Sequence, residues 1–172
     1  MRRFVNPGNT AFEVAVNSQI YVDKTGLLAY TNSVINTKQA LICSSRPRRF
    51  GKSITADMLC AYYSRGCDSD SIFASYEIAK SDSYKKYLNQ YDVIYLDIQW
   101  CMMDAGSAEQ TVSYLNYHVI EELKEVYPQI PLEGIRTAYG AMSCINAQTG
   151  VKFIVIIDEW DVLIRDEAAN EA

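Results

Sequence analysis

Two short stretches of the chain contain residues that could bind and cleave a phosphate ester. The first is SSRPRRFGKSIT, residues 44–55, in which Gly51, Lys52 and Ser53 match the end of the phosphate-binding pattern G-x-x-x-x-G-K-[ST]. In that pattern the glycines let the backbone curl round phosphate groups, the lysine reaches the β and γ oxygens, and the hydroxyl binds magnesium. Arg46 stands where the first glycine belongs, so a basic surface turn is the alternative interpretation.

Arg46, at the start of this loop, requires a backbone conformation different from the one that glycine would adopt there. Glycine usually supplies a positive φ at that position, and arginine adopts a positive φ only with strain. Pro47 follows Arg46 and offers another way round the turn, because it restricts its own φ and keeps the preceding residue extended.

The second stretch is FIVIIDEWD, residues 153–161, in which five apolar residues run into Asp158 and Glu159. Ligands of open α/β sheets bind at the C-terminal ends of the strands. A carboxylate there can hold magnesium, and the next one can orient and deprotonate the attacking water in phosphoryl transfer. Both stretches occur in the expected order, about a hundred residues apart, and together they predict a nucleotide site.

The elements that would position these residues alternate between strands and helices. Apolar runs predict buried strands and three- and four-residue apolar spacing predicts helices. In chain order we expect a helix capped by Asp23 over 23–35, a strand over 39–45, a helix over 51–66, short helical pieces around 83–88, a strand over 91–100, helices over 107–127 and 134–148, and a strand within 151–164. Strands this apolar, separated by helices, indicate an α/β fold with a mostly parallel sheet covered on both faces.

Composition narrows the class of protein. With 172 residues, 49% of them hydrophobic, the chain fits one globular domain. Its net charge of -5 provides no overall basic field for nucleic acid, and no segment resembles a signal peptide or a membrane span, so we expect a cytoplasmic protein that does not bind membranes. Five scattered cysteines without a C-x-x-C pair indicate reduced, mostly buried thiols, and a single histidine, His118, argues against a His/Cys metal site.

At these motifs the chain resembles the AAA-ATPase-like family, a divergent branch of the P-loop ATPases. The resemblance rests on YVDKT at 21–25, RPRRFGKSIT at 46–55 and IIDEWD at 156–161, which together span most of the chain. It implies that an arginine-led phosphate loop is the usual form, so that Arg46 is a family feature. Family members more often have tyrosine where Trp160 stands. The implied fold is a three-layer P-loop NTPase fold, here apparently truncated after the Walker B strand.

The same resemblance implies roles for individual residues. ATP with Mg²⁺ would be the ligand, Lys52 would contact the β and γ phosphates, and Ser53 and Asp158 would serve the magnesium. Glu159 would be the general base, which makes Lys52 and Glu159 the catalytic pair. The remaining nucleotide contacts would come from Tyr21, Lys24, Arg46, Pro47, Arg48, Arg49, Phe50, Gly51 and Ile54.

Several of these roles have alternatives. Tyr21 and Lys24 would lie against the base, or YVDKT is only a capped helix with an exposed lysine. Arg48 and Arg49 would add charge at the phosphates, reach a neighbouring subunit in a self-association, or simply be solvated.

The resemblance also suggests an organisation for the whole chain. Residues 1–38 would be a helical lead-in, 39–165 the nucleotide-binding core and 166–172 a frayed end, with a C-terminal nuclease-like domain of the PD-(D/E)XK type in many family members. The first function is then an Mg²⁺-dependent ATPase that drives an attached effector domain. The alternatives are a non-hydrolysing nucleotide-binding interaction module, and a nucleic-acid contact through the arginine-rich loop and Phe50.

Overall fold

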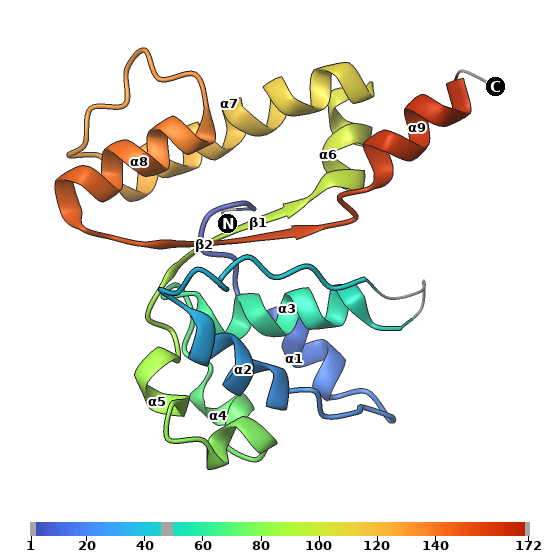
Figure 1. Cartoon of the computed structure of the whole chain (residues 1–172), viewed down its shortest axis with the longest axis vertical. Helices are drawn as coiled ribbons and strands as arrows, with labels where there is room; N and C mark the ends of the chain where they lie inside the picture. Colours follow the sequence, from blue (N-terminus) through green and yellow to red (C-terminus); the bar gives the residue numbers. More distant parts are fainter. Residues whose placement is uncertain (1–2, 46–49, 171–172) are drawn as a thin grey trace. The chain divides into compact units, whose positions relative to one another are not determined.

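The computed structural model of the chain describes residues 3–45 and 50–170, with the side chains described up to residue 166. Two compact units make up the fold (Figure 1). One contains Pro7–Tyr91, and the other contains Met1–Asn6 with Asp92–Ala172. We call them the helical unit and the sheet unit and describe each by itself.

The sheet unit is built on two parallel strands. β1 (Asp92–Asp97) pairs with β2 (Phe153–Asp158) along their whole length, so that Asp97 lies beside Asp158 at the C-terminal end. The N-terminal segment joins β1 as well, through an antiparallel bridge between Val5 and Ile94. Parallel pairing requires a long crossover between the strands, and three helices supply it here.

Helices flank this sheet (Figure 1). They are α6 (Ile98–Ala105), α7 (Ala108–Val126), α8 (Ala138–Thr149) and α9 (Val162–Asn170). α7 and α8 pack against each other, and their buried Val119, Leu123 and Ile145 form one core with Ile94 of β1. The apolar face of each helix and the sheet thus exclude water from a common interior, which confirms an α/β fold with a parallel sheet flanked by helices.

The helical unit consists of short helices around one longer helix. They are α1 (Thr10–Val16), α2 (Gly26–Val34), α3 (Lys52–Tyr63), α4 (Asp70–Phe73), the 3-10 helix η1 (Glu77–Lys80) and α5 (Tyr84–Tyr87). Buried aromatic rings hold it together: Phe12 stacks on Phe73 with ring centroids 5.1 Å apart, and Tyr62 meets the edge of Phe73 at 5.4 Å. Such pairs add about 1 kcal/mol each to the burial of their area.

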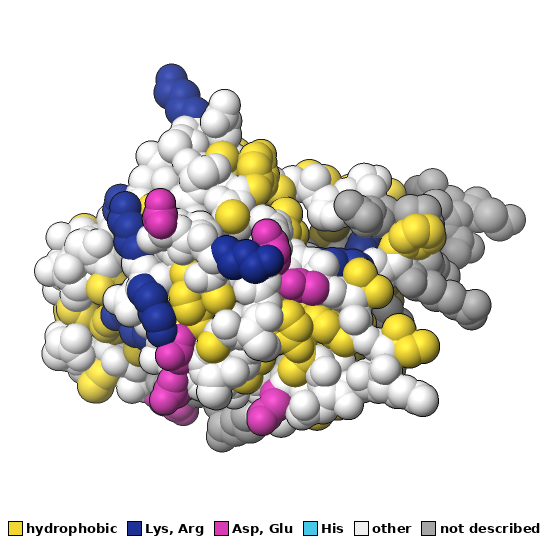
Figure 2. All heavy atoms as spheres, turned by 90° about the horizontal axis from the view of Figure 1, so that it is seen from below, with side chains coloured by type: hydrophobic (Ala, Val, Ile, Leu, Met, Phe, Trp, Pro, Cys, Tyr) yellow, Lys and Arg dark blue, Asp and Glu magenta, His cyan; other side chains and the backbone are white. Residues whose placement is uncertain are grey.

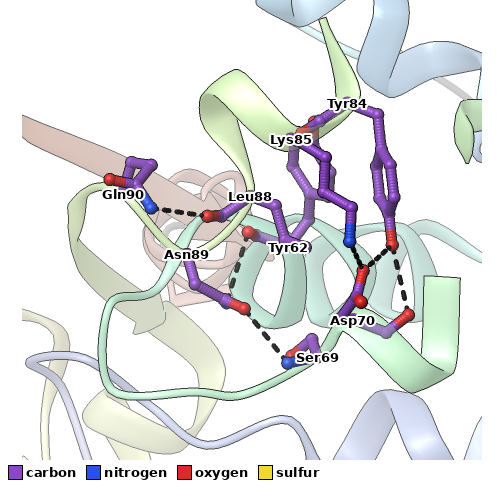
Figure 3. Close-up of polar contacts among 8 residues, drawn as sticks. All are labelled: Tyr62, Ser69, Asp70, Tyr84, Lys85, Leu88, Asn89 and Gln90. Carbon is purple, nitrogen blue, oxygen red and sulfur yellow. Dashed lines mark hydrogen bonds and ion pairs between the residues drawn. The ribbon is translucent and has the colours of Figure 1, made fainter. Parts of the chain in front are cut away.

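A side chain ties the end of α3 to the loops that follow (Figure 3). Asn89, at a positive φ of 55°, donates through Nδ2 to the carbonyls of Ala61 at 3.0 Å and Ser64 at 2.8 Å, and its Oδ1 accepts from the amide of Ser69 at 3.0 Å. The last carbonyl groups of a helix have no hydrogen-bond partner within the helix. The side-chain amide of Asn89 supplies the missing hydrogen bonds. The C-terminal end of α3 is therefore held in place, away from its phosphate-loop end.

One predicted strand is wrong. Residues 40–45 carry no strand, and all of 39–45 is exposed, with Leu41 96% and Ile42 47% accessible. An apolar run becomes a buried strand only where neighbouring strands take its backbone hydrogen bonds and helices cover its side chains. Within the part of the chain that the structure describes, no strand pairs with this segment.

The predicted strand over 91–100 also ends earlier than expected. Ile98 and the two residues after it start α6, because the Asp97 side chain accepts a hydrogen bond from the amide of Trp100 at 3.0 Å and caps the helix. The helix predicted over 107–127 is confirmed as α7, capped by Ser107, and the one over 134–148 begins later, at Ala138, behind the cap of Thr137.

The start of the first expected helix and the C-terminal end of the chain also differ from the sequence-based expectations. The helix expected from Asp23 begins at Gly26, since the Asp23 carboxylate accepts the amides of Thr25 and of Glu77 instead of capping a helical turn. Residues 166–170, the described part of the expected frayed end 166–172, lie in α9. Among the described residues, no helix combines the length and the apolar character that a membrane span requires.

Candidate functional site

The phosphate-loop motif begins a helix in the helical unit. Gly51 is the N-cap of α3 in the left-handed conformation, φ 73° and ψ 36°, and Lys52 and Ser53 are its first two residues. The carbonyl of Gly51 accepts hydrogen bonds from the amide of Thr55 at 3.1 Å and from its hydroxyl at 2.9 Å. Among the described residues no side-chain cap hydrogen bond is found at this N-cap, and the first turn of the helix has no acidic residue. The amides and the positive end of the helix dipole therefore suit an anion.

The YVDKT segment lies directly against this loop. Lys24 donates a hydrogen bond from Nζ to the carbonyl oxygen of Phe50 at 2.9 Å. A Cβ added to Gly51 would lie 2.9 Å from the same Nζ atom, so the flexible end of the Lys24 side chain would have to move. Gly51 thus serves two purposes: it adopts the positive φ, and it leaves room for the Lys24 contact.

The neighbours of Lys24 anchor the segment. The Asp23 carboxylate accepts amide hydrogen bonds from Thr25 at 2.8 Å and Glu77 at 2.9 Å, and the Thr25 hydroxyl accepts one from the amide of Ile78 at 3.1 Å. Burial opposes ionisation of Asp23, but these amide hydrogen bonds outweigh it and lower the pKa of the Asp23 carboxyl. The tyrosine of the motif, Tyr21, meets the ring edges of aromatic neighbours instead of standing free.

Asp158 ends β2 in the sheet unit and is 6% exposed. Its Oδ1 accepts the amide of Glu159 at 3.0 Å, whereas its Oδ2 is buried with no hydrogen-bond partner among the described residues. Asp97 lies beside it on the neighbouring strand. Burial raises the pKa of the Asp97 carboxyl, the amide of Trp100 opposes this, and the Asp158 carboxylate raises it further. Two carboxylates thus share one end of the sheet.

Glu159 occupies a strained backbone position next to them. Its φ is 52°, in the left-handed region that residues with a Cβ adopt at a cost of about 1 kcal/mol. Its carboxylate pairs with the guanidinium of Arg165 on α9 at 3.1 Å, and the same guanidinium pairs with Asp161 at 3.0 Å. The candidate base is thus already engaged by a cation in this structure.

The donor set suits a hard divalent cation only in part. Among the described residues there is no group of three or more His, Cys, Asp or Glu side chains that could hold a metal ion. The buried, unpartnered Oδ2 of Asp158 is nevertheless an oxygen of the kind that Mg²⁺ prefers, and magnesium usually keeps several waters beside one or two carboxylates. The site therefore fits magnesium held largely through water and a bound phosphate, not a cage of protein ligands.

The structure brings together some of the predicted site residues. Lys24 reaches Phe50 and Gly51, next to Lys52, Ser53 and the half-exposed Ile54, in the helical unit. Asp158 and Glu159 are adjacent in the sheet unit. The predicted nucleotide contacts of Arg46, Pro47, Arg48 and Arg49 lie outside the described residues.

Two residues of the acidic end were missed from the sequence. Asp97 follows the apolar run VIYL in the same way as Asp158 follows IVII. This similarity between the two strand ends is the pattern from which Asp97 could be predicted as a second acidic residue of the site. The sequence contains no comparable pattern for Arg165, because its pairing with Glu159 depends on the direction in which α9 leaves the strand.

A parallel sheet flanked by helices, with a Gly-Lys-Ser loop at a helix start and an Asp-Glu pair at a strand end, is consistent with a P-loop-like α/β protein. The family model described as "Predicted AAA-ATPase" matches residues 8–172, and the chain belongs to this AAA-ATPase-like family. No curated protein and no solved structure matched the chain. Family membership supports the terms ATP-binding and P-loop NTPase for this chain.

Proposed function

We propose that this chain is an Mg²⁺-dependent ATP-binding P-loop domain that hydrolyses ATP. The observation that carries the proposal is Gly51, a left-handed N-cap that starts α3, with Lys52 and Ser53 as the first two residues of the helix. Helix starts of this kind bind phosphate groups through backbone N–H groups and the helix dipole. Adenine as the base rests on the family.

Each chemical role follows from the type of side chain. The Lys52 ammonium neutralises charge on the β and γ phosphates, and the Gly51 amide donates to a phosphate oxygen. Ser53 and Asp158 would hold Mg²⁺, which supplies charge neutralisation on the phosphate oxygens when bound. Glu159 accepts a proton from the attacking water. The assignment of both halves to one nucleotide rests on the family and on the order of the motifs in the chain.

Three finer features belong to the same proposal. They are a three-layer arrangement of the nucleotide-binding core, self-association, and coupling of hydrolysis to an attached effector domain, which the resemblance suggests is nuclease-like. A pull-down or activity assay of the longest natural form of the protein, with Lys52→Ala as the comparison, tests the coupling. Effector activity that is independent of ATP and of Lys52 would contradict it.

Binding is the first test. Calorimetric titration of the chain with a non-hydrolysable ATP analogue and Mg²⁺ is expected to show binding that Lys52→Ala abolishes. Lys86→Ala is the matched control, because Lys86 lies on α5 beside the Tyr87 ring and far along the chain from the loop. A folded wild-type chain that binds no nucleotide, or binds equally well without Lys52, would overturn the proposal.

Hydrolysis is the second test, and it separates the ATPase from a non-hydrolysing binding module. The ion pair between Glu159 and Arg165 favours the second candidate in this state, because it occupies the base. Steady release of phosphate that disappears in Glu159→Gln, with nucleotide affinity retained, would establish the ATPase. Binding with no turnover in the wild type would leave the interaction module as the function.

A nucleic-acid contact has less support. The net charge is -5, and on the face drawn in Figure 2 lysine and arginine side chains are interspersed with acidic ones. Electrostatic binding of nucleic acid needs clustered cations and weakens steeply with salt. Salt-sensitive binding of single-stranded DNA or RNA that is lost in Phe50→Ala would be the evidence for it.

A further inference from the structure

The hydrogen bond from Lys24 to Phe50 determines which way one peptide group of the phosphate loop points. Lys24 Nζ donates to the Phe50 carbonyl oxygen at 2.9 Å. None of the described peptide bonds is cis, and in a planar trans peptide the carbonyl and the following N–H point in opposite directions. The Gly51 N–H is therefore directed away from Lys24.

This orientation matters because the opposite one would repel the ligand. The peptide joining Phe50 and Gly51 comes immediately before α3, where N–H groups must face a bound phosphate. If this peptide rotated, a carbonyl oxygen would face the phosphate and one donor would be lost. Glycine at position 51 makes such a rotation easy, since it accepts almost any backbone conformation. Something outside the loop is needed to prevent it.

The structure makes Lys24 well suited to that task. Both of its chain neighbours are tied by hydrogen bonds to the start of η1, Asp23 to the amide of Glu77 and Thr25 to the amide of Ile78. The Lys24 backbone is thereby held between two anchors, and its side chain spans the short distance to the loop. A charged donor also holds a carbonyl more strongly than a neutral one does.

We propose that Lys24 is a positioning residue of the nucleotide site, which orients the peptide between Phe50 and Gly51 so that the Gly51 amide donates to a phosphate of the bound nucleotide. The inference rests on the proposed function. It assigns YVDKT to the phosphates and not to the base: Lys24 provides the contact, and Asp23 and Thr25 hold it in place.

The chain offers a direct probe of this one peptide. Phe50–Gly51 is the only place where glycine follows phenylalanine. Protein labelled with ¹³C at the phenylalanine carbonyl and ¹⁵N at glycine therefore gives a single carbonyl-filtered amide signal, which belongs to this peptide. In the wild type the signal is expected to shift when the ATP analogue and Mg²⁺ are added.

Lys24→Met is the test variant, because it retains the length and packing of the stem but has no donor. We expect the signal of the free protein to move from its wild-type position, and the affinity for the ATP analogue and for ADP to fall by about tenfold, the loss typical of a hydrogen bond from a charged group. Lys24→Arg is expected to restore the signal and most of the affinity. Lys80→Met, which removes an exposed partner of Glu77 on η1, is the control and should change neither.

The outcomes separate this inference from the proposed function. A wild-type chain that binds no nucleotide contradicts the proposed function. A wild type that binds through Lys52, with a Lys24→Met variant of unchanged affinity and signal, overturns the role of Lys24 alone. Lower affinity with an unchanged free-protein signal would mean that Lys24 acts by its charge and does not orient the peptide. Thermal unfolding of each variant excludes a general loss of the fold, and Lys24→Leu, which also has no donor, is the second variant if Lys24→Met does not fold.

Discussion

The guanidinium of Arg165 pairs with the carboxylate of Glu159 at 3.1 Å, six residues earlier in the chain. Glu159 stands at the end of β2 with a φ of 52°, and Arg165 lies on the first turns of α9. The strained turn between strand and helix therefore brings a cation onto the residue that we propose as the catalytic base.

This pair predicts that Arg165 restrains hydrolysis. The carboxylate must leave the guanidinium before it can accept a proton, and a partly exposed ion pair contributes about 0.5–1 kcal/mol. We expect Arg165→Met to raise the steady-state rate of phosphate release about two- to fivefold, measured against Glu159→Gln as the inactive baseline. A lower rate in Arg165→Met would show instead that Arg165 orients Glu159 for the reaction.

The two reasons for glycine at position 51 can be separated by a matched pair of substitutions. Gly134→Ala places a Cβ in open space at a φ of 79°, so it measures the cost of the conformation alone, about 1 kcal/mol. Gly51→Ala also displaces the flexible end of Lys24, so we expect a similar cost in urea unfolding but weaker nucleotide binding, because the Lys24 contact with Phe50 is lost. A much larger cost at Gly51 than at Gly134 would show that Lys24 is held rigidly in its position.

The acidic end of the sheet predicts a pH dependence of stability. The pKa of Asp97 is raised, by burial first and also by Asp158. The folded state therefore holds this proton more tightly than the unfolded chain, and stability is lost as the pH rises from the ordinary pKa of the carboxyl to the raised one. Asp97→Asn keeps a side-chain acceptor for the Trp100 amide. It should raise the melting temperature at pH 7 without metal and have little effect below pH 3.8, the ordinary pKa.

The buried carboxylate of Asp92 links β1 by hydrogen bonds to the N-terminal segment and to the residue that follows α7. Asp92 is fully buried and accepts from Asn6 Nδ2 and from the Tyr127 hydroxyl, each at 2.5 Å. Asp92→Ala takes this acceptor from both donors, and we expect a loss of about 3 kcal/mol in the free energy of unfolding. Tyr127→Phe removes one contact and should cost about half as much. Chemical denaturation monitored by circular dichroism compares the two.

Cysteine labelling tests the unexpected exposure of residues 39–45. Cys43 lies in this segment and is exposed, whereas Cys60 and Cys101 are buried. Burial also raises the pKa of the Cys101 thiol to about 11, which keeps it as the unreactive thiol at neutral pH. In native protein we expect iodoacetamide to modify Cys43 first, as read by peptide mass spectrometry. If Cys43 is modified only when the protein unfolds, this segment is buried, as expected for the strand that the sequence predicts.

Local sequence alone determined several features of this protein. The apolar spacing and Ser107 predict α7 almost to the residue, and Gly51 with Lys52 and Ser53 predicts the start of α3. The apolar run before Asp158 predicts β2, and the three motifs together predict the family to which the chain belongs. Helical periodicity, caps and left-handed glycines act over a few residues, so a sequence window contains all of their causes.

Tertiary structure decided what distant residues do to one another. Whether residues 39–45 form a strand depends on partner strands, which come from other parts of the chain. The meeting of Lys24 with Phe50, of Asp97 with Asp158 and of Arg165 with Glu159 has no sequence signature of its own. Such contacts arise only when packing brings separate segments together, because hydrogen bonds and ion pairs act over a few ångströms in space and are indifferent to separation along the chain.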